Sequence, residues 1–194
     1  MLAAMTGVNE HTMTPSNSSS WLSRFAQLPT QRWPWALLAV TSFALIGAAM
    51  YFQYVLDLQP CVRCIYQRTA VLALGLIALI PLINPQIKPL KWAGLLTWLG
   101  ISVWGYVIAT DHVALQQSAN SWFAVCDINP RFPEFMPLHQ WLPGFFGAPG
   151  SCGDIDWQFA GLSMPQWLRV IFAGYAVTAV AVIAAHLTST AKQR

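Results

Sequence analysis

The stretch PCVRCIYQRTAVLALGLIALIPLI, residues 60–83, places two cysteines at the mouth of a long apolar run. Pro60 has no backbone N–H to donate, so it suits the start of a helix better than its interior. If Cys64 is helical, Arg68 is its i+4 neighbour and lies on the same helix face. The positive end of the helix dipole and this arginine both favour a thiolate at Cys64, and the thiolate is the reactive form of cysteine. We therefore expect a reactive thiol in the first turn of an apolar helix.

The composition of the whole chain is that of a membrane protein. Of its 194 residues, 56% are hydrophobic and only 9% are charged, against about 25% charged in an average soluble domain. A bilayer span takes roughly 20 apolar residues, and four stretches are long enough: residues 33–56, 65–83, 92–110 and 164–187. None of them alternates polar and apolar faces as the helices of a soluble protein do. The sequence therefore predicts an all-α fold, an integral membrane four-helix bundle over residues 33–187 with a long outer loop between helices 3 and 4.

The placement of basic residues predicts how this bundle is oriented. Before span one, between spans two and three and after span four, the basic residues are Arg24, Arg32, Lys88, Lys91, Lys192 and Arg194. Four spans put all of these on one side, which the positive-inside rule makes the cytoplasm. Most acidic residues and all 4 cysteines then lie on the opposite side, in loops 57–64 and 111–163. We expect both termini to be cytoplasmic and both loops to face outward.

The two ends of the chain lie outside the predicted spans. Residues 1–32 are polar and serine-rich, which predicts a largely disordered cytoplasmic tail, and residues 188–194 form a second, short tail. A cleaved signal peptide is the alternative for the first part of the chain, because a basic flank precedes its apolar run. That run is longer than a typical signal-peptide core of about 7–15 residues, which favours an uncleaved span.

The loop 111–163 is long enough to suggest a function of its own. Within it, residues 135–146 are apolar and aromatic but too short and proline-rich to span a membrane. We predict that this segment lies on the outer membrane surface; packing of the same residues on the bundle is the alternative. At the end of the loop, Ser163 and Gln166 form a candidate capping box for the fourth helix.

The four cysteines fall into two pairs of different character. Cys61 and Cys64 form a C-x-x-C pair with an arginine one turn further along, which favours redox use over a structural bridge. Cys126 and Cys152, taken alone, would more commonly form a structural staple of the loop. Metal binding by the thiolates is a further alternative, but structural zinc sites usually combine two short-spaced pairs, and no histidine lies at ligand spacing to this one. We therefore expect no metal site.

Two ionisable residues near the cysteine pair are candidates for a functional role. An arginine inside a membrane span marks a functional site by default, although an arginine near a helix end can also simply extend to the membrane surface. Arg68 can hold Cys64 as a thiolate, or donate hydrogen bonds to a carbonyl oxygen of a lipid-soluble cofactor. His112, just beyond span three, can exchange protons near neutral pH, but a solvated loop histidine is the simpler interpretation.

At these residues the chain resembles the DsbB family, the quinone-linked thiol oxidases of the bacterial inner membrane. The likeness covers about residues 33–187 and rests on PCVRCIYQR at 60–68, FAVCD at 123–127, RFPE at 131–134, Cys152, and MPQWL at 164–168. A C-x-x-C motif alone is weak evidence, but this combination is highly specific. One position departs from the family pattern, because Gln67 stands where an acidic residue is expected before the arginine.

The resemblance implies a bacterial inner-membrane enzyme whose long loop is periplasmic. Cys61 and Cys64 would pass electrons to ubiquinone or menaquinone, with Cys64 and Arg68 beside the quinone ring and His112 as a further candidate at the cofactor site. Cys126 and Cys152 would reoxidise a periplasmic DsbA-like thiol oxidase, with Cys126 forming the mixed disulfide.

The expected partners are therefore this DsbA-like oxidase, the membrane quinone pool and the lipid bilayer, and no nucleic acid. Two alternatives stay open at this point. One is a membrane thiol reductase of the vitamin K epoxide reductase type, which is also a small membrane bundle with C-x-x-C chemistry. The other is a thiol sensor or metal scaffold without enzymatic activity.

Overall fold

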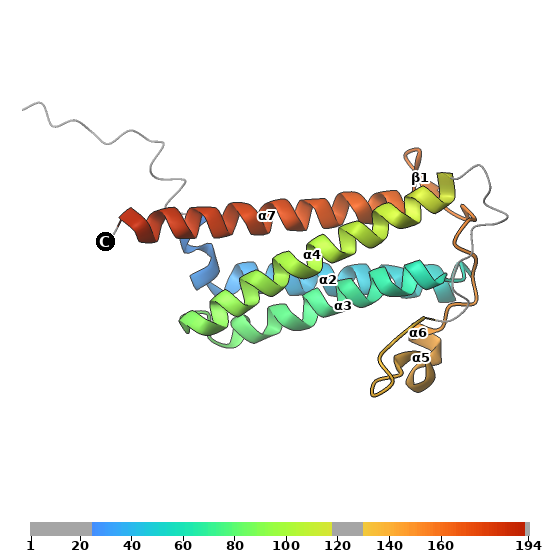
Figure 1. Ribbon diagram of the computed structural model, residues 1–194, viewed down its shortest axis with the longest axis horizontal. Helices are drawn as coiled ribbons and strands as arrows, with labels where there is room; N and C mark the ends of the chain where they lie inside the picture. The colour runs from blue at the N-terminus through green and yellow to red at the C-terminus, as the bar shows by residue number, and fades with distance from the viewer. Residues whose placement is uncertain (1–24, 118–129, 193–194) are drawn as a thin grey trace, which may run out of the picture.

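Four long helices dominate the computed structural model, which describes residues 25–117 and 130–192. The long helices are α2 (Arg32–Tyr54), α3 (Val62–Ile83), α4 (Lys88–Gln117) and α7 (Met164–Lys192). They lie side by side along the long axis of the molecule (Figure 1). Each is long and apolar enough to cross a membrane. The predicted all-α four-helix membrane bundle is therefore confirmed.

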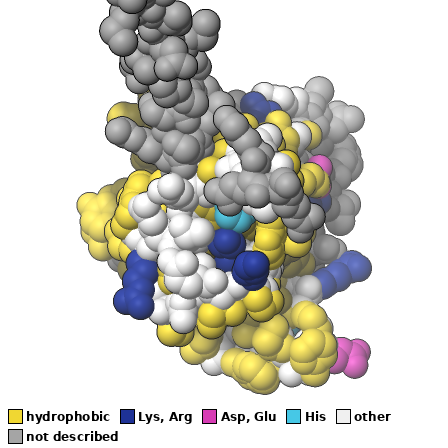
Figure 2. Space-filling model, turned by 90° about the vertical axis from the view of Figure 1, so that its left-hand side faces the viewer, with side chains coloured by type: hydrophobic (Ala, Val, Ile, Leu, Met, Phe, Trp, Pro, Cys, Tyr) yellow, Lys and Arg dark blue, Asp and Glu magenta, His cyan; other side chains and the backbone are white. Residues whose placement is uncertain are grey.

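Successive long helices run in opposite directions, which gives the bundle two chemically different ends. We call one the lysine end, because the basic residues Arg32, Lys88 and Lys91 lie at the starts of α2 and α4 there. Figure 2 looks onto this end and shows Lys and Arg side chains gathered on it. We call the other the cysteine end, because Cys61 and Cys64 lie there at the start of α3. All acidic residues that the structure describes belong to segments at the cysteine end: Asp57, Asp111, Glu134, Asp154 and Asp156.

Helix α3 is the centre of the packing. It contacts α2 on one side and α4 on the other, and α4 in turn packs on α7, whereas α2 and α7 contact each other little. Half of the apolar window of α3 (50%) is buried inside the bundle, against 17% for α7. The core that joins the helices includes Trp35, Leu74, Leu95 and Phe172. The remaining apolar side chains point outward, as expected of helices whose solvent is lipid.

Helix α4 is longer than the predicted third span. The apolar stretch ends at Thr110, but the helix continues to Gln117, because residues 111–117 contain no proline or glycine to stop it. Asp111 and His112 therefore lie in the last turns of a helix, where sequence analysis placed them in a loop.

The first residues that the structure describes also differ from the predicted tail. Residues 25–30 are helical and end in the short helix η1 (Leu28–Thr30). Pro29 is buried, and its carbonyl oxygen accepts a hydrogen bond from Trp35 Nε1 at 3.1 Å. This part of the tail therefore packs against the lysine end of the bundle. Residues 1–24 lie outside the described part of the chain.

The loop before α7 contains short elements at the cysteine end. They are α5 (Leu138–Trp141), α6 (Pro143–Phe146), and the antiparallel strands β1 (Gln158–Phe159) and β2 (Leu162–Ser163). Figure 1 shows α5 and α6 beside the bundle, next to the start of α3. Phe135 and Trp141 in this region are 82% and 60% exposed, so the surface segment that we predict at residues 135–146 does present aromatic side chains outward. Its contact with a membrane stays a prediction.

The start of α7 is held by the predicted cap and by a bond to α4. The backbone N–H of Ser163 donates to Gln166 Oε1 at 2.8 Å, which is one half of a capping box. The hydroxyl of Ser163 instead donates to Gln116 Oε1 at 2.9 Å. The cap residue thus ties the first turn of α7 to the last turn of α4 and fixes the wall of the site described next.

Candidate redox site

The C-x-x-C pair lies at the N-terminus of α3, where the sequence places it. Cys61 is the N-cap residue, and its sulfur accepts a hydrogen bond from the backbone N–H of Cys64 at 3.4 Å. Both cysteines are free thiols, and their Sγ atoms are 3.0 Å apart. Cys61 is buried, whereas Cys64 is partly exposed. Because the two sulfurs lie in contact, a small side-chain movement suffices to join them in a disulfide once an oxidant takes up the two electrons and the two thiol protons leave.

The two thiols of the pair are not equivalent. The hydrogen bond with Cys64 and the burial of the side chain raise the pKa of Cys61 above its ordinary value. When the pair loses one proton, Cys61 therefore keeps its own and donates it to the sulfur of Cys64. Cys64 also lies in the first turn of α3, where the helix dipole favours negative charge. The structure therefore favours Cys64 as the nucleophilic member of the pair.

His112 lies against this pair, so its interpretation as a solvated loop histidine is wrong. The side chain is 3% exposed and comes from α4. Its Nε2 lies 3.6 Å from Cys61 Sγ, and its Nδ1 lies 3.4 Å from Gln67 Nε2. The ring also has a hydrogen bond to the backbone of Cys152. His112 thus connects the pair in α3 to the loop that carries the third cysteine.

Arg68 is buried in the bundle and does not extend to the membrane surface. Its Nη1 donates to Gln53 Oε1 and to the carbonyl oxygen of Phe145, each at 2.8 Å. The guanidinium also lies over the Phe145 ring, 5.3 Å from its centroid. Gln53 Nε2 donates in turn to the carbonyl oxygen of Gly144 at 3.0 Å. Arg68 and Gln53 therefore hold the α6 segment against α2 and α3.

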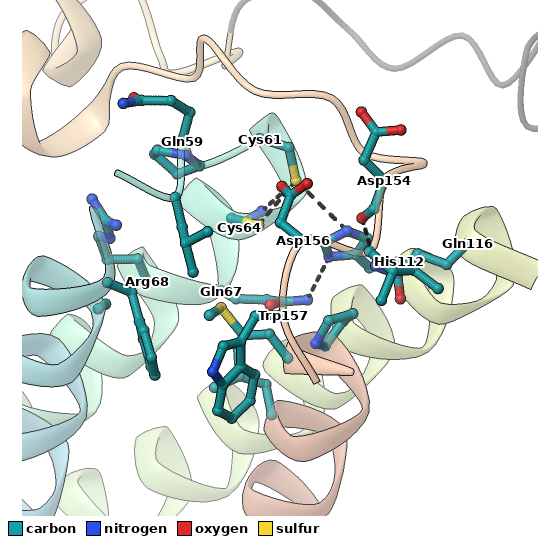
Figure 3. A pocket seen from close by; sticks show the side chains of 18 of the residues that line it. Gln59, Cys61, Cys64, Gln67, Arg68, His112, Gln116, Asp154, Asp156 and Trp157 are labelled. Carbon is teal, nitrogen blue, oxygen red and sulfur yellow. Dashed lines mark hydrogen bonds between the residues drawn. The ribbon is translucent and has the colours of Figure 1, made fainter. Parts of the chain in front are cut away.

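A pocket of about 110 Å³ lies between the cysteine ends of the four long helices. Figure 3 shows the side chains that line it, with Cys64, Gln67 and Arg68 on one wall and His112 on another. The apolar part of the lining includes residues of α2, α3, α7 and the loop before α7, among them Leu45, Ile46, Phe52, Val71, Trp157 and Leu168. The site therefore combines a reactive sulfur, a buried cation and an apolar wall.

Two buried polar atoms at this pocket have no hydrogen-bond partner among the described residues. They are Nε of Arg68, which is a donor, and Oε1 of Gln67, which is an acceptor. Arg68 is 7% exposed and Gln67 is 1% exposed. Buried polar groups are normally paired, and an unpaired one costs about 1–3 kcal/mol. Their position in the wall of the pocket points to a ligand with both an acceptor and a donor.

The second cysteine pair is only partly described. Cys152 is buried, 1% exposed, and disulfide-bonded. Cys126, for which a role in the partner reaction is predicted, lies outside the described residues. Of the second pair, the described part of the chain therefore contains Cys152. Its backbone interacts with His112, the same residue that contacts Cys61.

Comparison with known proteins identifies the family. The model of the family "Disulfide bond formation protein DsbB" matches residues 31–182, most of the chain. The chain belongs to the DsbB family. A disulfide bond formation protein B of Idiomarina loihiensis is 48% identical over 164 residues, which cover 84% of this chain and 91% of that protein. Those of Pseudoalteromonas translucida and Vibrio cholerae are 47% and 41% identical, over 87% and 88% of this chain and 96% and 98% of theirs.

DsbB relatives are named for disulfide bond formation, and the geometry fits that activity. The structure gathers five of the residues that sequence analysis singled out around one pocket or next to it: Cys61, Cys64, Arg68, His112 and Cys152. It leaves Cys126 outside the described residues.

Sequence reasoning missed the part that glutamines play in this DsbB site. Gln67 bonds to His112, and Gln53 bonds to Arg68. The available signal was a polar amide inside an otherwise apolar span, which is as informative as a charge there.

Proposed function

We propose that this DsbB-family protein is a membrane thiol oxidase that reoxidises a DsbA-like periplasmic protein and passes the electrons to a membrane quinone. The observation that carries the proposal is the pair of unpartnered atoms in the wall of the Cys64 pocket. Arg68 Nε–H can donate to a carbonyl oxygen, and Gln67 Oε1 can accept from a hydroxyl. A quinone presents the first group and its reduced form, the quinol, presents the second. The residues present therefore fit this cofactor.

The residues of the pocket divide the work of holding a quinone. A bound quinone supplies a two-electron acceptor, which takes up two electrons and two protons. Arg68 binds and orients its carbonyl end, with the guanidinium fixed by Gln53 and by the carbonyl oxygen of Phe145. The apolar wall, which includes Phe52 and Leu168, receives the ring and excludes water. Cys64 lies in the same pocket, so its sulfur is the one that reacts.

The second disulfide links this site to the outside partner. A thiolate of the partner attacks the disulfide that contains Cys152, and the partner's second thiol then completes a new disulfide in the partner. The two thiols released in the loop reduce the Cys61–Cys64 disulfide in the same way. Each exchange moves two electrons and leaves the number of disulfides unchanged until the Cys61–Cys64 dithiol is oxidised. The interaction of His112 with the Cys152 backbone supports this path, because the same histidine contacts Cys61.

The potentials explain why a strong acceptor is needed. A DsbA-like oxidase has a reduction potential of about −120 mV. A thiol pool at about −200 mV has a potential about 80 mV too low to accept electrons from it. That step would be uphill by roughly 3.7 kcal/mol. An acceptor dissolved in the membrane and reached between helices avoids this barrier, and the pocket lies between helices.

The charge of the two ends supports the orientation that this function requires. Arg32, Lys88 and Lys91 belong to the lysine end, which Figure 2 shows with Lys and Arg side chains on it, whereas the described acidic residues belong to the cysteine end together with four arginines: Arg63, Arg68, Arg131 and Arg169. By the positive-inside rule, this distribution supports a periplasmic cysteine end. In intact spheroplasts, whose inner membrane is sealed, a membrane-impermeant thiol reagent should then label Cys64 after the protein is reduced. Labelling of Cys64 only after lysis of the spheroplasts would show that the cysteine end faces the cytoplasm.

Anaerobic turnover tests the proposal directly. Purified protein is mixed with reduced DsbA and ubiquinone-1, and loss of the quinone is followed by its absorbance. We expect quinone loss that depends on Cys64, so that Cys64→Ser lowers the rate by at least about 1,000-fold while leaving the helical circular dichroism unchanged. Full activity of Cys64→Ser, or no quinone loss with the folded wild-type protein, would overturn the proposal. The second result would favour a reductase or a thiol sensor.

A further inference from the structure

Three metal-binding atoms meet at the start of α3. The Sγ atoms of Cys61 and Cys64 and a ring nitrogen of His112 all lie within 4.8 Å of one another. Thiolate sulfur and imidazole nitrogen are the ligands that Zn²⁺ prefers in proteins. The spacing in the sequence argued against such a site, because the histidine belongs to a different helix. The packing of α4 on α3 supplies the third ligand that the spacing lacks.

The distances agree with a tetrahedral metal centre. Zinc lies about 2.3 Å from sulfur and about 2.0–2.1 Å from nitrogen, so a sulfur and a nitrogen on one ion are about 3.6 Å apart and two sulfurs about 3.8 Å apart. Cys61 Sγ and His112 Nε2 are 3.6 Å apart. The two sulfurs are 3.0 Å apart and must separate by about 0.8 Å. Side-chain rotation of Cys64, which is partly exposed to the pocket, can supply that movement.

The charges around the pocket favour a cation there once the thiols are ionised. Asp154 and Asp156 line the pocket, and Figure 3 shows Asp156 beside the cysteine pair and Asp154 above His112. Arg68 is the one Lys or Arg side chain among the described residues that line it, and Gln53 and Phe145 already bind its Nη1. Two thiolates and two carboxylates outnumber this single positive charge, so a divalent cation reduces the net charge of the site.

A second group of contacts prepares His112 as a ligand. A metal-bound histidine normally donates its other ring N–H to a carbonyl or carboxylate oxygen, which fixes the ring. Gln67 touches the Nδ1 side of the ring, and its Oε1 is buried without a partner among the described residues. A half-turn of the Gln67 amide would place Oε1 against Nδ1–H. This acceptor is not one of the three ligands, and in the metal-bound state it would serve His112 instead of a bound quinol.

We propose that the reduced Cys61–Cys64 pair and His112 together bind a thiophilic divalent cation, with Zn²⁺ as the first example. Binding requires both cysteines in the thiol state and releases their two protons to solvent. Because the metal occupies both sulfurs, it prevents formation of the Cys61–Cys64 disulfide and holds the site reduced. The binding itself does not rest on the proposed oxidase activity; only its inhibitory effect does.

Cobalt(II) is the probe for the first test. The full chain with Cys126→Ser and Cys152→Ser, in detergent and reduced under anaerobic conditions, is titrated with Co²⁺. We expect a thiolate-to-cobalt charge-transfer band that saturates at about one ion per chain and disappears when Zn²⁺ is added. Cys64→Ser in the same background should remove most of the band. Absence of the band in the background protein would overturn the proposal.

The role of His112 distinguishes a built site from simple dithiol binding. His112→Ala should weaken zinc affinity by at least about 100-fold, because even loss of an outer partner typically costs 10–100-fold. His139→Ala, in α5 and away from the three ligands, is the matched control and should bind as the background does. Equal affinity of His112→Ala and the background would show that the two thiols bind metal without the histidine, and would overturn the site.

A gain-of-signal variant guards against a folding defect in His112→Ala. His112→Cys replaces the imidazole by a third thiolate, so its cobalt charge-transfer band should be about half as intense again as that of the background. An unchanged band would show that residue 112 does not reach the metal.

Zinc should also inhibit quinone-dependent turnover of the wild-type protein. Cobalt binding without any turnover would refute the proposed oxidase and leave the metal site intact.

Discussion

Two pockets at opposite ends of the bundle differ in chemistry as well as in size. The pocket beside Cys64 has about 110 Å³, whereas a pocket at the lysine end has about 270 Å³. The smaller one contains Arg68, two aspartates and two thiols, but no charged residue lines the larger one, which lies between η1, α2, α4 and α7. In the larger pocket the Tyr175 hydroxyl donates to Thr41 Oγ1 at 2.9 Å, whereas the buried Trp98 Nε1 has no partner among the described residues. Volume alone would therefore have favoured the pocket without the cysteines.

The comparison predicts that substitutions at the cysteine end change activity, and the largest such effect outside the cysteines should come from Arg68. Arg68→Met removes the unpartnered Nε–H donor from the pocket and the bonds to Gln53 and Phe145. We expect quinone-dependent turnover to fall by about 100-fold, the usual loss for one preorganised donor in a dry site. Steady-state quinone reduction with reduced DsbA measures this effect.

Arg169→Met is the matched control for Arg68→Met. Arg169 lies on α7 and does not line the pocket. Its replacement should leave turnover within about twofold of the wild-type rate. Equal losses in both variants would mean that Arg68 acts through general stability rather than through the pocket.

Substitutions at the lysine end should change stability and leave activity per folded molecule intact. A Cβ on Gly94 would lie 2.6 Å from Pro81 Cγ and 3.1 Å from the ring of Trp35. Because both neighbours are rigid rings, we expect Gly94→Ala to lower the free energy of unfolding by about 1–3 kcal/mol. Unfolding in a detergent titration, followed by circular dichroism, measures the change.

Gly100→Ala provides the internal reference on the same helix. Nothing lies within 4 Å of a Cβ at Gly100, so this change should be neutral or slightly stabilising through helix propensity. A Gly94→Ala protein as stable as Gly100→Ala would contradict the close packing of α4 on α2 and α3.

The smallest effect should come from the satisfied polar pair in the larger pocket. Tyr175→Phe deletes the bond to Thr41 between α7 and α2. Hydrogen bonds between membrane helices contribute about 0.6 kcal/mol on average, so the loss of stability should be of that order. Turnover should not change. A clear loss of turnover would mean that the larger pocket takes part in the reaction. It would contradict the expectation that only the cysteine end determines activity.

The sequence predicted the features of this molecule that depend on local rules. The four helices follow from apolar length, and the shared face of Cys64 and Arg68 follows from i+4 spacing. The setting of His112 could not be predicted, because it depends on how α4 packs against α3 and on a helix that outlasts its apolar stretch. The contact between Arg68 and Phe145 likewise joins residues far apart in the chain, which no local pattern reveals.

The sulfur of Cys61 has two structural roles, and together they offer a way to follow the oxidation state of the protein. Cys61 Sγ belongs to the reactive pair and is also the acceptor that caps the backbone N–H of Cys64. Formation of a Cys61–Cys64 disulfide draws electron density away from that acceptor and weakens the cap. The amide of Cys64 should therefore exchange with deuterium faster in the oxidised protein than in the reduced one. Deuterium uptake at a single backbone position would then report the oxidation state of the protein in a native membrane, where no chromophore does.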